Sequence, residues 1–198
     1  WFKGNYPDLE FIEPGSTAYN LYARYDVGWY YNKPEYHEDN TVDSNKIPFD
    51  FRKGPLGKTC SDVLGLDYKE VKPKLTFKNT GSTIEGDYVV IAPHGSAHAK
   101  YWNREGGWQD VIDHLNSKGY KVVMITQELL GNEWHDSKLG GTLKNVIDKT
   151  GDAPLSERAN DMMNAKAFIG IGSGLSWLAW GLGTPVTMIS GFSKPYSE

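Results

Sequence analysis

The sequence has one cysteine, no long apolar run and no excess of basic residues, and each of these features excludes a class of protein. Cys60 alone cannot build an intrachain disulfide framework or a cysteine-cluster zinc site within the chain, so a reducing compartment fits best. No segment reaches the roughly 18 consecutive apolar residues that span a bilayer, and the opening WFKGNYPDLEF lacks the layout of a signal peptide. We therefore expect a cytoplasmic protein without a membrane span.

The charge balance argues against a polyanionic partner. The 198 residues include 21 Lys and Arg against 25 Asp and Glu, a net charge of −4. Such a chain lacks the electrostatic surface that nucleic acids and anionic membranes require, so we expect no nucleic-acid partner. Hydrophobic residues make up 39% of the chain. A chain of this length buries a core without disulfide or metal support, as one large domain or two small ones.

The two halves of the chain differ in their sequence patterns. Up to about residue 86 the chain is rich in Tyr, Pro, Asn and Asp and shows no clean period. LEFIEPG (9–15) predicts a short strand ended by a turn, and NKPEYHEDNTVDSNKIPFDFRKGP (32–55) predicts an exposed loop. LGKTCSDVLGLDY (56–68) predicts a short helix with Thr59 or Ser61 as its N-cap.

The second half alternates apolar runs with amphipathic segments. Four buried strands are predicted from DYVVIAP (87–93), YKVVMIT (120–126), KAFIGIG (166–172) and PVTMIS (185–190). Helices are predicted from GGWQDVIDHLNSKG (106–119), PLSERANDMMNA (154–165) and GLSWLAWGLG (174–183). This alternation indicates a parallel sheet covered on both faces, a doubly wound α/β domain over about residues 87–198. In such sheets, ligands bind beyond the carboxyl ends of the strands.

Three segments at predicted strand ends carry candidate binding residues. APHGSAHAKYWN (92–103) offers a sharp turn at Ser96 and then Lys100, whose ammonium group can reach an anion or simply be solvated. Glu128 can accept hydrogen bonds from ribose hydroxyls, or can start a helix where the dipole favours a carboxylate. His94 and His98 lie four residues apart, but in a loop without a third ligand this spacing does not indicate a metal site.

The third segment has a glycine, serine, glycine sequence between a strand and a helix, at residues 172–174. The backbone N–H groups of Ser173, Gly174 and Leu175 would then be available at a helix N-terminus, which is a binding site for phosphate. The alternative is a tight turn that uses glycine for steric reasons alone. A cation, a diol acceptor and an anion-binding helix start at one sheet edge together favour a nucleoside diphosphate.

The segment GIGSGLSWLAWGLGTP (170–185) resembles the GNDSGPMHLAAALGTP motif of bacterial heptosyltransferases, glycosyltransferase family 9. The agreeing residues are Gly170, Ser173, Gly174, Leu178, Ala179, Leu182, Gly183, Thr184 and Pro185. APHGSAHAKYWN stands where that family has HPGAS…KRWP. PLGKTCSDVLGLDYKEVKPKL (55–75) and GLSWLAWGLGTPVTMISGFSKPYSE (174–198) are similar to the autotransporter-type O-heptosyltransferases, so the resemblance covers most of the chain.

The resemblance implies a GT-B glycosyltransferase fold. Residues 87–198 would be the nucleotide-sugar-binding, Rossmann-like domain, truncated at its C-terminus. Residues 1–86 would be an incomplete N-terminal α/β part, the acceptor-side domain, with the interdomain link. The chain would then be an internal fragment of a longer protein. In the autotransporter branch, a cysteine-rich metal site follows the region where this sequence ends, and nothing here can be assigned to it.

The resemblance also implies roles for individual residues. Ser96, Lys100, Ser173, Gly174 and Leu175 would bind the donor diphosphate, and Glu128 would bind the ribose. Gly172 and Trp177 stand where the lipopolysaccharide enzymes have a sugar-contacting Asp and a His, so these sugar-proximal positions imply a different recognition of the donor sugar. No catalytic residue is assigned, because no segment matches the part of the family that carries the general base.

The expected function is inverting transfer of a heptose-like sugar from a nucleoside diphosphate, with ADP-heptose favoured, to a hydroxyl of a protein or glycan such as a Ser of an autotransporter. No cofactor and no metal are expected within this chain, and exposed apolar faces would allow self-association. Two alternatives stay open: a catalytically inactive nucleotide-sugar-binding module, and a nucleoside-diphosphate-sugar epimerase.

Overall fold

The computed structural model describes residues 3–13, 23–26, 29–32 and 55–190. The chain divides into two compact units, one of residues 1–7 and 72–192 and the other of residues 8–71 and 193–198. The domain boundary expected at residue 86 stays a prediction. The exposed loop expected over residues 32–55 lies outside the described residues except at its ends.

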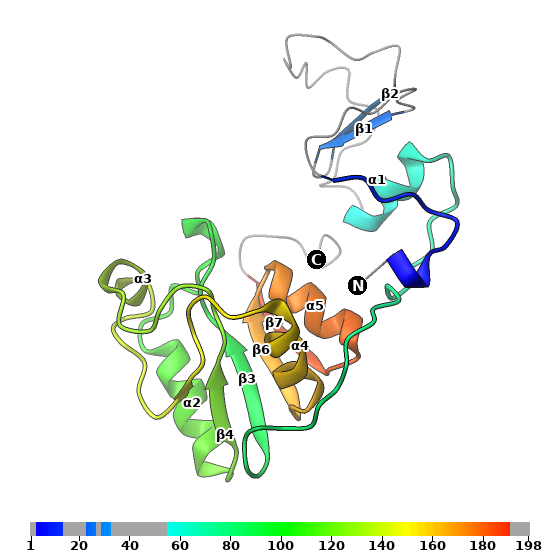
Figure 1. The fold of residues 1–198 in the computed structure, drawn as a ribbon. Coiled ribbons are helices and arrows are strands. Elements are labelled where there is room, and N and C mark those ends of the chain that lie inside the picture. The colour runs from blue at the N-terminus through cyan, green and yellow to red at the C-terminus, as the bar shows by residue number, and fades with distance from the viewer. Residues whose placement is uncertain (1–2, 14–22, 27–28, 33–54, 191–198) are drawn as a thin grey trace. The chain divides into compact units, whose positions relative to one another are not determined.

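The larger unit contains a parallel five-stranded sheet (Figure 1). Its strands are β3 (Tyr88–Ala92), β4 (Lys121–Met124), β5 (Ile147–Asp148), β6 (Ala167–Ile171) and β7 (Val186–Ile189). Its helices are η5 (His98–Lys100), α2 (Gly107–Ser117), α3 (Glu133–Ser137), α4 (Leu155–Met163) and α5 (Gly174–Leu182), with η1 (Lys3–Asn5) near the N-terminus. The spatial order β5-β4-β3-β6-β7 is that of the Rossmann fold, in which the chain starts at a central strand and turns back at β6.

The apolar residues of the sheet are buried on both of its faces. On one face, Trp108 and Ile112 of α2 are fully buried against β3 and β4. On the other face, Met162 of α4 and Ala179 of α5 pack against β3 and β6. The predicted doubly wound α/β class is therefore confirmed, with a fifth strand, β5, where four were expected. The break in strand order between β3 and β6 is the position at which such sheets bind ligands.

The segment that leads into β3 and the first residue of β3 are fixed to α4 by hydrogen bonds. The Asn160 side-chain oxygen accepts from the backbone N–H of Thr80 at 2.8 Å, and its amide donates to the carbonyl of Gly81 at 2.9 Å. The Tyr88 hydroxyl donates to the carbonyl of Asp161 at 2.7 Å. These bonds satisfy polar groups that burial would otherwise leave without partners.

The smaller unit contains β1 (Ala23–Asp26), β2 (Trp29–Asn32) and α1 (Leu56–Val63). β1 and β2 form an antiparallel hairpin from a segment of ambiguous period. The strand expected at residues 9–15 is wrong over its described part: residues 9–13 form no strand, and Leu9, Phe11 and Ile12 are exposed. An apolar segment forms a strand only where a neighbouring strand completes the ladder of backbone hydrogen bonds.

The predicted cap of α1 is also wrong. The helix begins at Leu56 after Pro55, whose φ of −65° suits the residue before a helix. Thr59 and Ser61 therefore lie inside the helix, where the Ser61 hydroxyl donates to the carbonyl of Gly57 at 3.2 Å. The proline before the helix was thus a stronger start signal than the hydroxyl residues within it.

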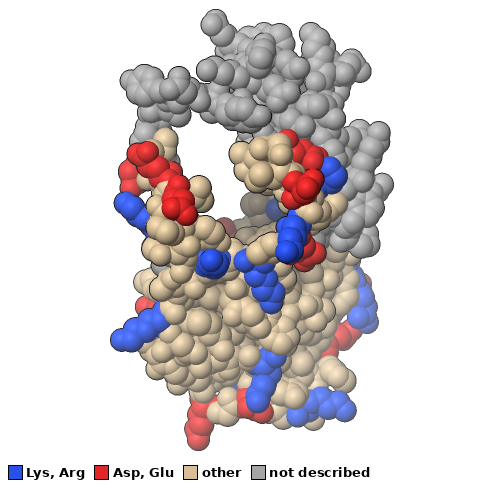
Figure 2. Space-filling model, turned by 90° about the vertical axis from the view of Figure 1, so that its right-hand side faces the viewer, with Lys and Arg blue, Asp and Glu red and all other residues tan. Residues whose placement is uncertain are grey.

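Two properties concern the described residues as a whole. None of their helices is both long enough and apolar enough to cross a membrane. Figure 2 shows Lys and Arg side chains and Asp and Glu side chains both distributed over the face in view.

Candidate functional site

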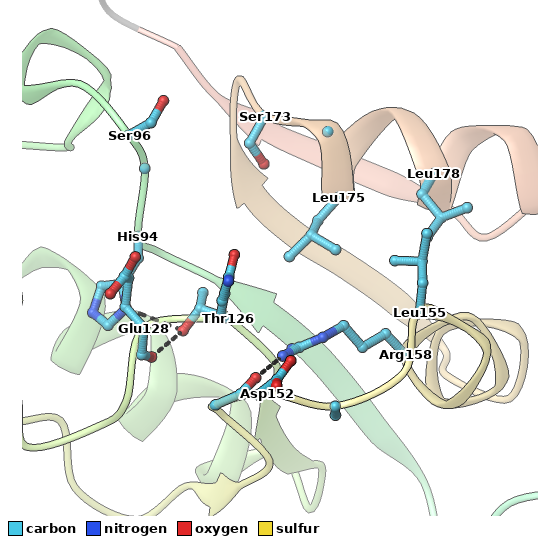
Figure 3. Close-up of a pocket in the computed structure, with 15 residues that line it drawn as sticks. His94, Ser96, Thr126, Glu128, Asp152, Leu155, Arg158, Ser173, Leu175 and Leu178 are labelled. Carbon is cyan, nitrogen blue, oxygen red and sulfur yellow. Dashed lines mark hydrogen bonds between the residues drawn. The ribbon is translucent and has the colours of Figure 1, made fainter. Parts of the chain in front are cut away.

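A pocket of about 600 Å³ lies at the carboxyl ends of the strands in the larger unit (Figure 3). Four loops build it, following β3, β4, β5 and β6, and the first turns of α4 and α5 complete its wall. The lining residues are His94, Gly95, Ser96, Thr126, Gln127, Glu128, Gly151, Asp152, Ala153, Leu155, Arg158, Ser173, Gly174, Leu175 and Leu178. The pocket therefore sits at the ligand-binding position that the strand order defines.

Five of the candidate residues from the sequence line this pocket: Ser96, Glu128, Ser173, Gly174 and Leu175. Lys100 does not line the pocket. Its side chain lies against Gly95, and Gly95 does line the pocket. Gly172 and Trp177 are also outside the wall. The Trp177 ring is 45% exposed and packs edge-on against Trp180, with their centroids 5.9 Å apart. The roles assigned to these residues stay predictions, and the structure brings the first five together.

Gly170 and Gly174 lie on the two sides of the turn into α5, and different constraints act on the two positions. A Cβ at Gly170 would lie 2.6 Å from the Phe168 ring and 3.1 Å from the Ser176 hydroxyl, so packing requires glycine there. A Cβ at Gly174 would meet nothing within 4 Å. No neighbour within the described chain excludes a side chain at Gly174, and its position in the pocket wall leaves room for a ligand to approach the backbone.

The N-terminus of α5 carries no side-chain cap. Ser173 is the N-cap residue, but its hydroxyl accepts no hydrogen bond from the first turn. The same hydroxyl is buried and finds no partner in the described part of the chain. The first N–H groups of a helix have no intrahelical acceptor and carry the positive end of the helix dipole. This corner of the pocket is therefore suited to an anion.

His94 is held at the foot of the pocket by Thr126. The Thr126 hydroxyl donates to the carbonyl of Glu128 at 3.0 Å, so its oxygen accepts from His94 Nδ1, also at 3.0 Å. Burial lowers the pKa of His94, and the nearby His135 lowers it further against the opposing effect of Asp136 and Glu128. The lowered pKa favours the neutral form of His94, whose buried Nε2 has no partner in the described part of the chain. His98 packs against Trp134 instead, with ring centroids 5.2 Å apart, so the two histidines do not converge.

Glu128 belongs to a second polar chain beside the pocket. His135 Nε2 lies 3.1 Å from Glu128 Oε2, and the Tyr101 hydroxyl lies 2.6 Å from His135 Nδ1. Neither Tyr101 nor His135 is among the residues singled out from the sequence. His135 lies on α3 (Glu133–Ser137), whose N-cap is Asn132. Because Asn is a preferred N-cap, Asn132 was the signal in the sequence for the start of this helix.

Arg158 is the other residue that sequence reasoning missed. It is buried in the pocket wall, where its Nη2 donates to the carbonyl of Gly151, while Nη1 has no partner in the described part of the chain. Burial lowers the pKa of Arg158, and the nearby Asp152 opposes that effect. Leu155, Leu175 and Leu178 line the pocket on the side of α4 and α5 (Figure 3). The sequence did contain a signal for Arg158. It lies on the same helical stripe as three apolar residues, Leu155, Ala159 and Met162, where a charged side chain is unusual.

The described residues offer no metal site. No three His, Cys, Asp or Glu side chains gather among them in a way that could hold a metal ion, and Cys60 is exposed. A sheet of Rossmann order with a pocket at its switch point defines a doubly wound α/β protein with a ligand site of nucleotide size. An uncapped helix N-terminus and a carboxylate stand at opposite sides of that pocket.

Comparison with known proteins gives the family. The model of glycosyltransferase family 9 (heptosyltransferase) matches residues 54–197. The chain belongs to this family, as the resemblance in the sequence predicts. It is 39% identical over 197 residues to the autotransporter heptosyltransferase BAHTCr of Citrobacter rodentium, covering 98% of this chain and 44% of that protein.

TibC of Escherichia coli O78:H11, another autotransporter heptosyltransferase, is 39% identical over 197 residues, covering 98% of this chain and 45% of TibC. The crystal structure of dodecameric, iron-containing TibC in complex with ADP-D-β-D-heptose matches the fold with a TM-score of 0.78 at 37% identity, over 100% of this chain and 49% of that one. The GT-B class predicted from the sequence is thereby confirmed. The described residues here do not fit an iron site.

The inactive autotransporter heptosyltransferase BimC of Burkholderia thailandensis is 29% identical over 197 residues, covering 99% of this chain and 44% of BimC. The chain thus spans about half the length of the curated relatives it matches. An active and an inactive type of protein are both similar to it.

Proposed function

We propose that the full-length protein is an inverting glycosyltransferase that transfers heptose from ADP-heptose to a hydroxyl group, namely a Ser of an autotransporter protein. Family membership and 39% identity to two autotransporter heptosyltransferases support the activity and the acceptor. The complex of TibC with ADP-D-β-D-heptose supports the donor. The cytoplasmic location expected from the sequence stays a prediction.

One observation carries the proposal on the structural side: the open Gly174 at the uncapped start of α5, in a pocket lined also by Glu128. We place the diphosphate at Ser173, Gly174 and Leu175, and the ribose at Glu128. The adenine then lies toward Leu155, Leu178 and Arg158, the apolar side of the pocket. A pocket of about 600 Å³ is within the usual range for small-molecule sites.

Transfer requires that the leaving diphosphate be stabilised. As the bond between the sugar and the diphosphate breaks, negative charge grows on the phosphate oxygens, and the α5 N-terminus with the Lys100 ammonium would stabilise it. The acceptor hydroxyl loses its proton to a general base that no described residue supplies in this proposal. Because TibC is dodecameric, we also propose that the full-length protein self-associates.

Calorimetric titration of the full-length protein with ADP, UDP and GDP tests the donor site. We expect ADP to bind most tightly and UDP most weakly, because the apolar side of the pocket favours a purine ring. A protein that binds none of the three nucleotides would contradict the proposal.

The inactive binding module is the second candidate, because BimC covers the same region at 29% identity. It predicts the same nucleotide binding without sugar release. The epimerase alternative needs a histidine that converges with carboxylates in the pocket, whereas His94 is held by Thr126 and His98 packs on Trp134. Turnover of ADP-heptose, measured as released ADP, separates the candidates.

A further inference from the structure

His135 contacts Glu128 but does not itself line the pocket. Its Nε2 is 3.1 Å from Glu128 Oε2, and its Nδ1 is 2.6 Å from the Tyr101 hydroxyl. A carboxylate only accepts hydrogen bonds, so Nε2 carries the proton of its contact with Glu128. Burial raises the pKa of Tyr101, which keeps its hydroxyl protonated and able to donate. In the tautomer with the proton on Nε2, Nδ1 accepts from Tyr101, and the three side chains form one chain of hydrogen bonds that ends at Glu128.

The fold fixes the His135 ring before any ligand binds. The Asn132 side chain accepts from the backbone N–H groups of Trp134 and His135 at 3.2 and 3.3 Å, which starts α3 at a defined residue. The His135 ring then packs edge-on against Trp134 at 4.6 Å between centroids, and lies 5.1 Å from the His94 ring. The His135 side chain is 13% exposed, whereas that of Glu128 is 47% exposed.

A half-exposed glutamate on a loop has many rotamers, and holding it in one of them costs entropy when a ligand binds. A carboxylate that a hydrogen bond already holds in one rotamer loses less entropy when the ligand binds. Glu128 contacts His135 through Oε2 and still lines the pocket, so its remaining acceptor capacity is available to a ligand there.

We propose that His135, fixed by Tyr101, is a positioning residue that orients the Glu128 carboxylate for the ribose hydroxyls of the donor. This proposal rests on the donor site proposed above and adds to it the residues that determine recognition of the ribose. His135 acts through Glu128 and contacts neither the sugar nor the reacting atoms.

The test compares ADP with 2′-deoxy-ADP and 3′-deoxy-ADP in calorimetric titrations of the full-length protein. His135→Gln places an amide nitrogen near the position of Nε2, whereas His135→Asn reaches only to the position of Nδ1. We expect the wild type to prefer ADP over at least one deoxy analogue, His135→Asn to bind ADP about two- to tenfold more weakly and to lose that preference, and His135→Gln to recover it. His98→Asn removes another histidine packed on Trp134 and should keep the preference.

Tyr101→Phe removes the hydroxyl that contacts His135. It tests the positioning role independently if His135→Asn fails to fold. It should weaken the preference partly, because Nδ1 loses its donor and the ring loses its fixed tautomer. A wild-type preference that both His135→Asn and Tyr101→Phe retain would overturn the positioning role while leaving the donor site intact. Equal binding of ADP and both deoxy analogues by the wild type would also overturn it. Failure of the wild type to bind ADP at all would instead contradict the proposed function.

Discussion

Lys100 stands beside the pocket, with its side chain against Gly95. In the proposed reaction its ammonium group stabilises the negative charge that develops on the leaving diphosphate. Removing one such contact costs about 2.7–4 kcal/mol of transition-state stabilisation, so Lys100→Ala in the full-length protein should slow turnover by about 10²–10³-fold. Steady-state rates of ADP release measure this effect.

A matched surface lysine provides the control for that variant. Lys118 is the C-cap residue of α2, and this helix ends at the opposite edge of the sheet from the pocket. Lys118→Ala removes the same charge from the molecule and should leave the rate unchanged. Full rate and full donor affinity in Lys100→Ala would show that its ammonium group has no part in the reaction.

His94 makes stability depend on pH. Its pKa is lowered in the folded protein, mainly by burial, so below the ordinary value of about 6.5 the unfolded chain binds a proton that the folded chain resists. The stabilising effect is therefore present above that pH and is lost as the pH falls toward the lowered pKa. The slope for one proton is at most about 1.4 kcal/mol per pH unit.

His94→Asn tests this dependence, because the Asn amide can still donate to Thr126 but does not titrate. Urea unfolding at about pH 7 and about pH 5 should show a smaller loss of unfolding free energy in the variant than in the wild type. Equal losses in the two proteins would assign the pH dependence to other groups.

At the scale of elements, Gly170 in β6 and Gly174 at the start of α5 lie on the two sides of one turn, and their substitutions have opposite expected effects. Gly174→Ala meets no neighbour and should raise the unfolding free energy by about 0.4–1 kcal/mol, because Ala restricts the unfolded chain. The same methyl group would point into the pocket and weaken ADP binding by about tenfold or more, since a hydrogen bond to a charged group is worth about 1.5–3 kcal/mol. Stability and affinity should thus change in opposite directions.

Gly170→Ala is the matched variant. Its methyl group would press on Phe168 and Ser176, which should lower the unfolding free energy by about 1–3 kcal/mol. Thermal unfolding with and without ADP measures both quantities for both variants. Unchanged ADP affinity in Gly174→Ala would favour the alternative in which this glycine serves only the turn.

The elements that the sequence predicted are those with strong periodic patterns. β3, β4, β6 and β7 are continuous apolar runs, and α2, α4 and α5 follow the helical period between them. β5 was missed because Ile147 and Asp148 form only two residues of strand, which gives no apolar run to detect. The chain of Tyr101, His135 and Glu128 could not be predicted, because its members come from three loops and helices that only the tertiary fold brings together.

At the scale of the whole molecule, the alternation of strands and helices predicted a parallel sheet but left its strand order open. The observed order places β3 and β6 side by side at the centre, so the loops after these two strands face one pocket. Five of the predicted binding residues line this pocket at the carboxyl ends of the strands, and their binding roles stay predictions. Arg158 was missed because it reaches that edge from inside α4, whereas the predicted residues follow strands.

The last prediction concerns the complete reaction. The full-length protein, given ADP-heptose and an autotransporter passenger protein, should release ADP and add heptose to Ser residues, because the chain belongs to a heptosyltransferase family and its pocket is the proposed donor site. Mass spectrometry of the passenger and quantification of ADP measure the two products together, which a transferase forms in equal amounts. A passenger in which the acceptor serines are replaced by Ala is the control. ADP binding without either product would identify the inactive binding module, whereas an altered nucleotide sugar without ADP release would identify the epimerase.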